Sequence, residues 1–399
     1  MNRIVIQSWA LLTDAYRELN SKKLFWITMV LSCLVVAVFA MFGLNKKGLT
    51  FLWFEFPLPA FNSDIFTPAL FYKFVFATLG IPVWLTWVAT VLALISTASI
   101  IPDFVASGSI ELTLSKPIGR VRLFLSKFIT GLLFVGLQVA VFTGACFLVI
   151  GIRGQVWEWG LWLAVPIVLL FFSYLYSICA LVGLITRSTI AALLVTLLCW
   201  FAFFVINQAD DLFILNRESA ELRVQDTDAI IAKRVAAAEK ALANAKEKNT
   251  PYPIAQEGED QLETINPLLK FARQQKREAE ESLETWQMWS RISFRVKTVL
   301  PKTTETIGLL GRRLLSLDEL TKLGLLRPDA NEVEGDETAE AQPNDRENRR
   351  RGPMGDSRAA KRLQLEMRTR SMPWVIGTSL GFEVIVIGLA LIIFSRRDF

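Results

Sequence analysis

The stretch PDFVASGSIELTLSKPIGRVRLFLSK, from Pro102 to Lys127, is polar and lies between two long hydrophobic segments. A few residues would be enough to join two neighbouring membrane spans, so a connection of this length calls for an explanation. Gly108 and Pro117 bracket a piece in which Ile and Leu alternate with polar residues, and basic residues follow it. We expect short helices on the inner membrane face. The alternative is a solvated loop held near lipid phosphates by its Lys and Arg side chains.

The segments around this loop predict a membrane protein. The chain has 399 residues, of which 52% are hydrophobic. Several segments exceed the roughly 18 apolar residues that a membrane span needs. We predict six spanning helices, at residues 24–44, 71–101, 128–152, 159–186, 189–206 and 373–394. The fold class is therefore an all-α polytopic membrane protein.

The ends of the chain and its short loops predict the orientation. Residues 1–23 place apolar side chains at near-helical spacing, which is typical of an amphipathic helix at a membrane interface. Charges interrupt this segment and no cleavage site follows, so we expect it to stay attached. Lys and Arg are concentrated in the loops that would be cytoplasmic if the N-terminus is inside. We therefore expect both termini in the cytoplasm, with residues 24–207 holding the first five spans and residues 373–399 the sixth span and a short tail.

Residues 208–372 are predicted to form a large, mostly helical extracytoplasmic domain. Two apolar stripes with alternating steps of three and four residues favour a helical hairpin at about 215–290, and one of them is broken by Lys276. They are Ile231, Val235, Ala238, Leu242 and Ala245, and Leu269, Ala272, Ala279, Leu283 and Trp286. An antiparallel coiled coil is one interpretation, and two helices packed on another surface are the other.

The rest of this domain has two further parts. Residues 292–326 regain apolar character and predict short amphipathic helices. Residues 328–356 are charged and nearly free of aromatic and branched apolar side chains, so we expect a flexible segment that cannot bury enough area to fold.

The composition argues against catalysis by this chain. It has no His, which removes imidazole bases and His-ligated metals, and its four Cys lie singly inside apolar runs. No GxxxxGK[ST] phosphate loop occurs, so we expect no ATP hydrolysis, no catalytic residue, no bound cofactor and no metal site. With 43 basic and 38 acidic residues the charge is too balanced to indicate a nucleic-acid partner.

Two polar side chains are predicted inside the membrane. Glu383 lies in the middle of the sixth span, where a charge is expensive and marks a functional site by default. A carboxyl group that is protonated or hydrogen-bonded between helices is the structural alternative. Gln138 in the third span is expected to hydrogen-bond between helices rather than to contact a substrate.

The loop resembles the cytoplasmic loop of the ABC type-2 permease family. In that family a Gly, an acidic residue and a Ser-(Lys/Arg)-Pro-x-x-Arg block precede a Lys at the start of the third span. The matching residues here are Gly108, Glu111, Ser115, Lys116, Pro117, Arg120 and Lys127. The resemblance implies that this loop carries a coupling helix that docks on a separate ATPase subunit, which binds ATP and Mg²⁺. It also implies short helices that dip back into the outer leaflet before the last span.

The function that follows from the resemblance is that of a permease subunit of an ATP-binding-cassette exporter. The expected partners are the ATP-binding subunit, a second permease copy (an identical chain or a paralogue) and membrane lipids. The expected location is the plasma (inner) membrane, as a multi-pass protein of a bacterium. The alternative is a membrane-anchored scaffold or assembly protein whose external coiled coil binds partner proteins and which transports nothing.

Overall fold

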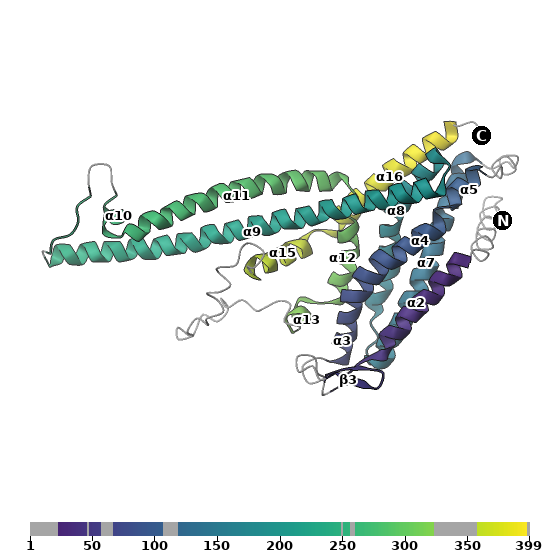
Figure 1. Cartoon of the computed structure of the whole chain (residues 1–399), viewed down its shortest axis with the longest axis horizontal. Helices are drawn as coiled ribbons and strands as arrows, with labels where there is room; N and C mark the ends of the chain where they lie inside the picture. Colours follow the sequence, from purple (N-terminus) through teal and green to yellow (C-terminus); the bar gives the residue numbers. More distant parts are fainter. Residues whose placement is uncertain are drawn as a thin grey trace. The chain divides into compact units, whose positions relative to one another are not determined.

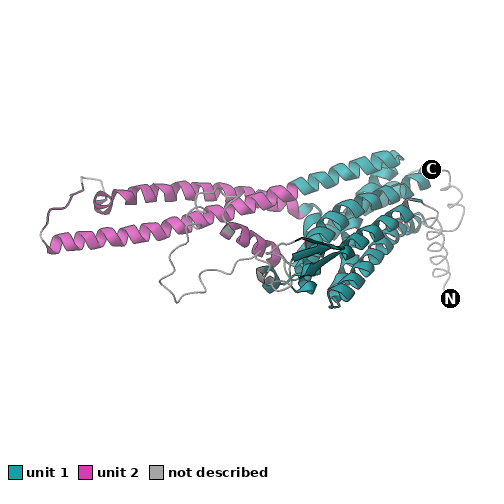
Figure 2. Ribbon diagram, turned by 60° about the horizontal axis from the view of Figure 1, so that its bottom comes forward, with its two compact units in different colours: residues 1–205, 299–332, 371–399 teal, residues 206–298, 333–370 magenta. Residues whose placement is uncertain are grey.

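The computed structural model describes residues 23–45, 48–56, 67–106, 119–248, 250–255, 260–322 and 357–396. The chain divides into two compact units (Figure 2). Unit 1 comprises residues 1–205, 299–332 and 371–399, and unit 2 comprises residues 206–298 and 333–370. Most of the predicted interfacial helix at 1–23 and the predicted flexible segment at 328–356 lie outside the described residues.

Unit 1 is a bundle of long apolar helices. They are α2 (Lys23–Met41), α7 (Arg120–Arg153), α8 (Ala164–Thr186), the first part of α9 (Thr189–Glu247) and α16 (Met372–Arg396). The short helix η2 (Trp159–Leu163) leads into α8. In the span formed by η2 and α8, 72% of the most apolar window is buried, against 50% or less in the other candidate spans. The fourth span is therefore the centre of unit 1, and α7 and α16 pack against it.

The second span is built from several helical pieces: α3 (Pro68–Val75), η1 (Phe76–Ala89), α4 (Thr90–Thr97) and α5 (Ile100–Ala106). The piece η1 is a π-helix, a wider helix with hydrogen bonds from residue i to residue i+5. Pro82 inside it has no N–H to donate. The hydroxyls of Thr86 and Thr90 each donate to a carbonyl oxygen five residues earlier, at 2.8 Å. Side-chain donors thus support the widened turns.

One part of unit 1 is not helical. Strands β1 (Phe42–Asn45), β2 (Gly48–Phe51) and β3 (Phe54–Phe56) form an antiparallel sheet in the order β1-β2-β3. Phe42 pairs with Phe51 and Asn45 with Gly48, whose φ of 140° suits glycine. Residues 42–56 therefore depart from the all-α expectation, because they form a small antiparallel β-meander.

Helix α12 (Thr303–Leu314) belongs to unit 1, followed by α13 (Leu317–Lys322). Its apolar face, formed by Ile307, Leu310 and Leu314, joins the hydrophobic core of unit 1. Helix α12 packs mainly against α8, η1, η2 and α16. The sequence-based division placed residues 292–326 in the domain of residues 208–372, whereas the structure groups residues 299–332 with the spanning helices because this face is buried there.

Unit 2 consists of the second part of α9, α10 (Gln261–Ile265), α11 (Pro267–Val299) and α15 (Ser357–Thr369). Figures 1 and 2 show α9 and α11 side by side. Their contacts run in opposite directions along the two helices, so the helices are antiparallel. The pairs include Arg234 with the carbonyl of Leu268, Asp228 with Lys276, Phe213 with Trp289, and Asp210 with Ser293. Ala238, Leu269 and Ala272 of the predicted stripes are buried.

Candidate functional site

Two of the residues assigned to the coupling loop lie at the start of α7. The guanidinium of Arg120 donates to the carbonyl oxygen of Ser395 in α16 at 3.0 Å, and Lys127 Nζ lies 5.8 Å from the ring centre of Phe104 in α5. The other five residues, Gly108, Glu111, Ser115, Lys116 and Pro117, lie outside the described residues. The structure therefore places the two ends of the predicted loop, residues 102–106 and 119–127.

The helix ends around Arg120 form one end of unit 1. Phe394 near the end of α16 contacts Phe104 and Phe124, with ring centres 6.3 and 5.7 Å apart. The backbone of α8 at Gly183 approaches Pro102 so closely that an added Cβ would lie 2.9 Å from the proline ring. This end therefore gathers α5, the start of α7, the end of α8 and the end of α16. Its basic residues are Arg120, Arg122, Lys127, Arg187 and Arg396.

The opposite end of unit 1 has basic residues that bind acceptors within the protein. Lys73 Nζ lies 2.5 Å from a carboxylate oxygen of Glu158 and 3.5 Å from one of Glu319. Arg153 donates to the hydroxyl of Tyr72 at 3.1 Å, and that hydroxyl donates to the carbonyl oxygen of Phe42 at 2.6 Å. At this end Lys73 and Arg153 are therefore bound to acceptors of unit 1.

Glu383 is buried in unit 1, 7% exposed, at the interface of α16 and α8. Its carboxyl oxygen Oε2 lies 2.9 Å from the hydroxyl of Ser173, which also lies 2.8 Å from the carbonyl oxygen of Leu170. A hydroxyl carries one hydrogen. A protonated Glu383 would donate to Ser173 and leave the Ser173 hydrogen for Leu170, so that both hydroxyl hydrogens have an acceptor. This geometry suits a neutral carboxyl group that joins two helices.

A second buried polar group was not predicted from the sequence. Lys302 precedes α12 and is fully buried. Its backbone N–H donates to the hydroxyl of Ser379 at 2.9 Å, its ammonium donates to the hydroxyl of Thr378, and Nζ lies 4.2 Å from the ring centre of Trp374. The ring face and the hydroxyl stabilise the buried cation. The segment VLPKTTET carries no periodic signal, so only its packing on α16 distinguishes Lys302 from a loop lysine.

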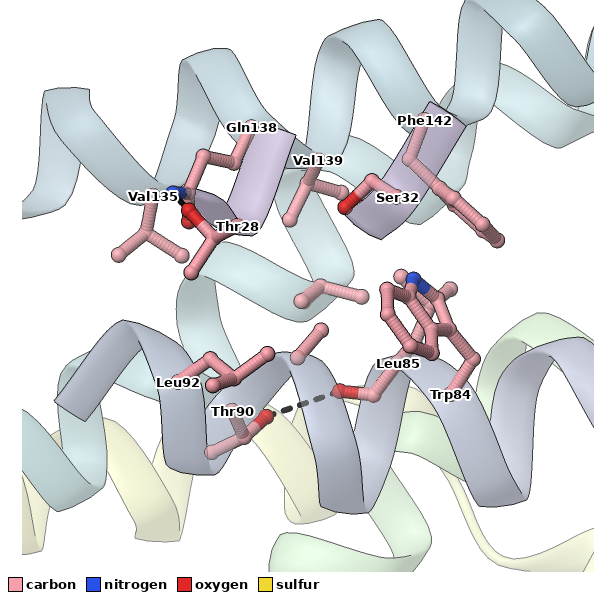
Figure 3. A pocket seen from close by; sticks show the side chains of 12 residues that line it. Thr28, Ser32, Trp84, Leu85, Thr90, Leu92, Val135, Gln138, Val139 and Phe142 are labelled. Carbon is pink, nitrogen blue, oxygen red and sulfur yellow. Dashed lines mark hydrogen bonds between the residues drawn. The ribbon is translucent and has the colours of Figure 1, made fainter. Parts of the chain in front are cut away.

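Gln138 of α7 forms a hydrogen bond with α2. Its amide nitrogen donates to the hydroxyl of Thr28, which in turn donates to the carbonyl oxygen of Phe25 at 2.8 Å. Figure 3 shows Gln138, Thr28 and Ser32 on one side of a small cavity, with Trp84 on the other. The cavity has a volume of about 20 Å³, which is room for one water molecule. The indole N–H of Trp84 is buried and makes no hydrogen bond within the described residues.

The buried polar side chains of unit 1, Glu383, Lys302 and Gln138, can position helices, and they can hold a proton or a water molecule. Within the described residues no three His, Cys, Asp or Glu side chains are grouped as a metal site. The four cysteines are free thiols, and Cys146 and Cys179 are buried. The polar groups described above, Glu383, Lys302 and Gln138, form contacts between helices of unit 1.

The long apolar helices of unit 1 make the chain a multi-pass helical membrane protein. Five helical segments of the described chain are long and apolar enough to cross a membrane: 68–105, 120–153, 159–186, 189–247 and 372–396. The apolar part of α2, Phe25–Met41, is shorter.

The chain belongs to the ABC-2 family of transporters. The family model described as ABC-2 family transporter protein matches residues 9–272, which is more than half of the chain. This match identifies an ABC-2 type permease and supports its role as the membrane component of an ABC transporter. No curated protein and no solved structure matches the chain.

Proposed function

We propose that the chain is the permease subunit of an ATP-binding-cassette exporter, which forms the translocation pathway and couples to a separate ATPase subunit. The family match carries this proposal, because it covers the predicted loop and the first five predicted spans. In the proposed complex ATP and Mg²⁺ bind to the partner, and this chain has no catalytic role. The translocation pathway forms with a second permease copy, identical or paralogous.

The proposed topology has six spans with both termini in the cytoplasm of a bacterium and the chain in its plasma membrane. The distribution of Lys and Arg over the short predicted loops supports it. The loops that would be cytoplasmic hold more of them, among them Arg120, Lys127 and Arg187, than the short loops that would lie outside, which hold Lys46, Lys47, Lys73 and Arg153. Cytoplasmic loops are enriched in Lys and Arg. Helix α2 then supplies the first span, and unit 2 lies outside the cell.

The proposed ATPase contact is the segment from Gly108 to Arg120. Arg120 is anchored to the end of α16 through Ser395, so a force on the loop would reach both α7 and α16. The acidic Glu111 and the basic Lys116 and Arg120 offer charges of both signs to a partner surface. This is the arrangement that the family resemblance leads us to expect for a coupling helix.

Copurification tests the proposal. The chain should be tagged, expressed in its own organism, extracted in mild detergent and purified, and the bound proteins identified by mass spectrometry. We expect a protein with Walker-type ATP-binding motifs in a fixed ratio to the permease. A scaffold would bring other partners and no ATP-binding subunit, and that result would contradict the proposal.

A further inference from the structure

Unit 2 contains a basic pocket between α9, α11 and α15. The cavity has a volume of about 210 Å³. Four arginines and two carboxylates are among its lining residues: Arg217, Arg291, Arg295, Arg370, Asp210 and Glu366. An excess of two positive charges in one cavity indicates an anionic ligand.

The two carboxylates are already engaged by groups of unit 2. Asp210 accepts from Ser293 at 2.9 Å and from Lys297 at 2.8 Å, and Arg370 lies 3.2 Å from it. Glu366 accepts from Arg217 at 2.6 Å. These ion pairs leave the carboxylates little capacity to neutralise further cations.

The two remaining arginines face solvent. Arg291 and Arg295 are exposed, and neither forms an ion pair with any residue in the described ranges. They lie four positions apart on α11, so both project from the same helix face. Guanidinium groups bind phosphate oxygens in a bidentate manner, which makes a phosphate group the anion that this pair suits best.

The position of the pocket in the chain indicates the source of that phosphate. Asp210 follows the apolar run of the fifth span, which ends at Ile206, within the same continuous helix. A rise of about 1.5 Å per residue places Asp210 about 6 Å beyond the apolar run, which is headgroup depth in a bilayer. Arg370 lies two residues before Met372, the start of α16, the last span.

The surface of α11 near the pocket also suits a membrane interface. Its C-terminal part exposes large apolar side chains that a water-facing helix would bury: Trp289 at 45%, Phe294 at 45% and Val299 at 71% exposure. Exposed Trp and Phe next to Arg are typical of helices at the level of lipid headgroups.

We propose that this pocket binds the phosphate group of an anionic membrane lipid. Arg291 and Arg295 contact the phosphate oxygens, and the exposed apolar residues of α11 contact the upper part of the acyl chains. The bound lipid fixes the base of the α9–α11 hairpin at the membrane surface. The proposal depends on the fifth and sixth spans crossing the membrane and not on transport activity.

The test measures lipid retention by the full chain. The parent protein is reconstituted in nanodiscs of phosphatidylcholine with a minor fraction of phosphatidylglycerol, transferred to mild detergent, and examined by native mass spectrometry. The variant is Arg291→Gln/Arg295→Gln. The matched control is Lys240→Gln/Lys246→Gln, which removes the same charge from exposed positions of α9. At about 1 kcal/mol for each basic residue at a membrane surface, we expect about 30-fold weaker retention of phosphatidylglycerol in the arginine variant.

The outcomes separate the possible ligands. Selective retention of phosphatidylglycerol by the parent and by the lysine control, but not by the arginine variant, supports the proposal. Equal retention by all three proteins overturns it. If inorganic phosphate alone raises the unfolding temperature of the parent in detergent, and no lipid is retained selectively, the pocket binds free phosphate and the lipid assignment is overturned. Circular dichroism of each variant establishes that the hairpin remains helical.

Discussion

Asp210 holds three donors together inside unit 2. Its side chain is 1% exposed and that of its partner Lys297 is 3% exposed, so this ion pair is almost fully removed from water. Ser293 uses the other carboxylate oxygen, and Arg370 approaches the oxygen that Lys297 uses. A buried pair of this kind contributes to specificity of packing, and the loss of either partner leaves an unpaired charge.

Asp210→Asn should therefore lower the free energy of unfolding by about 3–5 kcal/mol, because Lys297 loses its counter-charge. Asp228→Asn is the matched control on the same helix, since Asp228 pairs with Lys276 near the surface and should cost less than about 1 kcal/mol. Thermal unfolding of the purified chain provides the comparison. The double variant Asp210→Leu/Lys297→Met should recover most of the lost free energy of unfolding. If the losses caused by the two single substitutions simply add in the double variant, the ion pair does not have this role.

Two substitutions of Glu383 distinguish a structural role of this side chain from a role in transport. Glu383→Gln keeps the shape and can still bond to Ser173, so expression and transport-coupled ATPase activity should stay near those of the parent. Glu383→Leu leaves the Ser173 hydroxyl without that partner and should lower stability by about 1–3 kcal/mol. Val384→Leu, at a position 69% exposed on the same helix, is the control. Reduced coupled activity of the Gln variant at normal expression would instead assign Glu383 to the transport cycle.

Among the helices, the bounds of a span could be predicted from the sequence where they depend on the length of an apolar run. The fourth span was expected at 159–186, and the structure has a helical segment with those bounds. The fifth span was expected to end at Ile206, but α9 continues to Glu247 because no Gly or Pro interrupts the helix-forming residues that follow. The end of an apolar run marks the membrane boundary and not the end of a helix.

Other elements depend on tertiary contacts and could not be predicted. The π-helix η1 depends on hydroxyl groups and packing, which leave no periodic signal in the sequence. The sheet of β1–β3 is short, and its aromatic residues suit an interfacial loop equally well. Glu383 and Gln138 were singled out because polar residues in apolar runs are conspicuous, whereas Lys302 and Asp210 lie in mixed segments and are distinguished only by burial.

The packing of α7 on α8 leaves no room for a side chain at Gly131. A Cβ added at Gly131 would lie 2.5 Å from the hydroxyl and 2.6 Å from the ring of Tyr176, whose side chain is almost fully buried. Gly131→Ala should lower the free energy of unfolding by about 1–3 kcal/mol through overpacking. Gly388→Ala on α16 meets no atom within 4 Å and should be neutral or gain up to about 1 kcal/mol from helix propensity. Thermal unfolding that shows no difference between the two would contradict this packing.

At the scale of the whole molecule, the proposed topology puts unit 2 outside the cell. Lys248 lies at the tip of the hairpin, after the end of α9, and Arg396 lies at the end of α16. In a background without the four native cysteines, Lys248→Cys should react with an impermeant thiol reagent in intact cells. Arg396→Cys should react only after lysis. The reverse pattern would invert the topology and place unit 2 in the cytoplasm.

In the proposed complex, the cytoplasmic loop couples ATP hydrolysis in the separate subunit to this chain. The most direct measurement is the ATPase rate of the purified permease–ATPase complex with the charge-reversal variant Glu111→Lys/Lys116→Glu. We predict that this variant inserts in the membrane at the parent level but binds the ATPase weakly and no longer stimulates it. Unchanged copurification and unchanged ATPase stimulation would contradict the account.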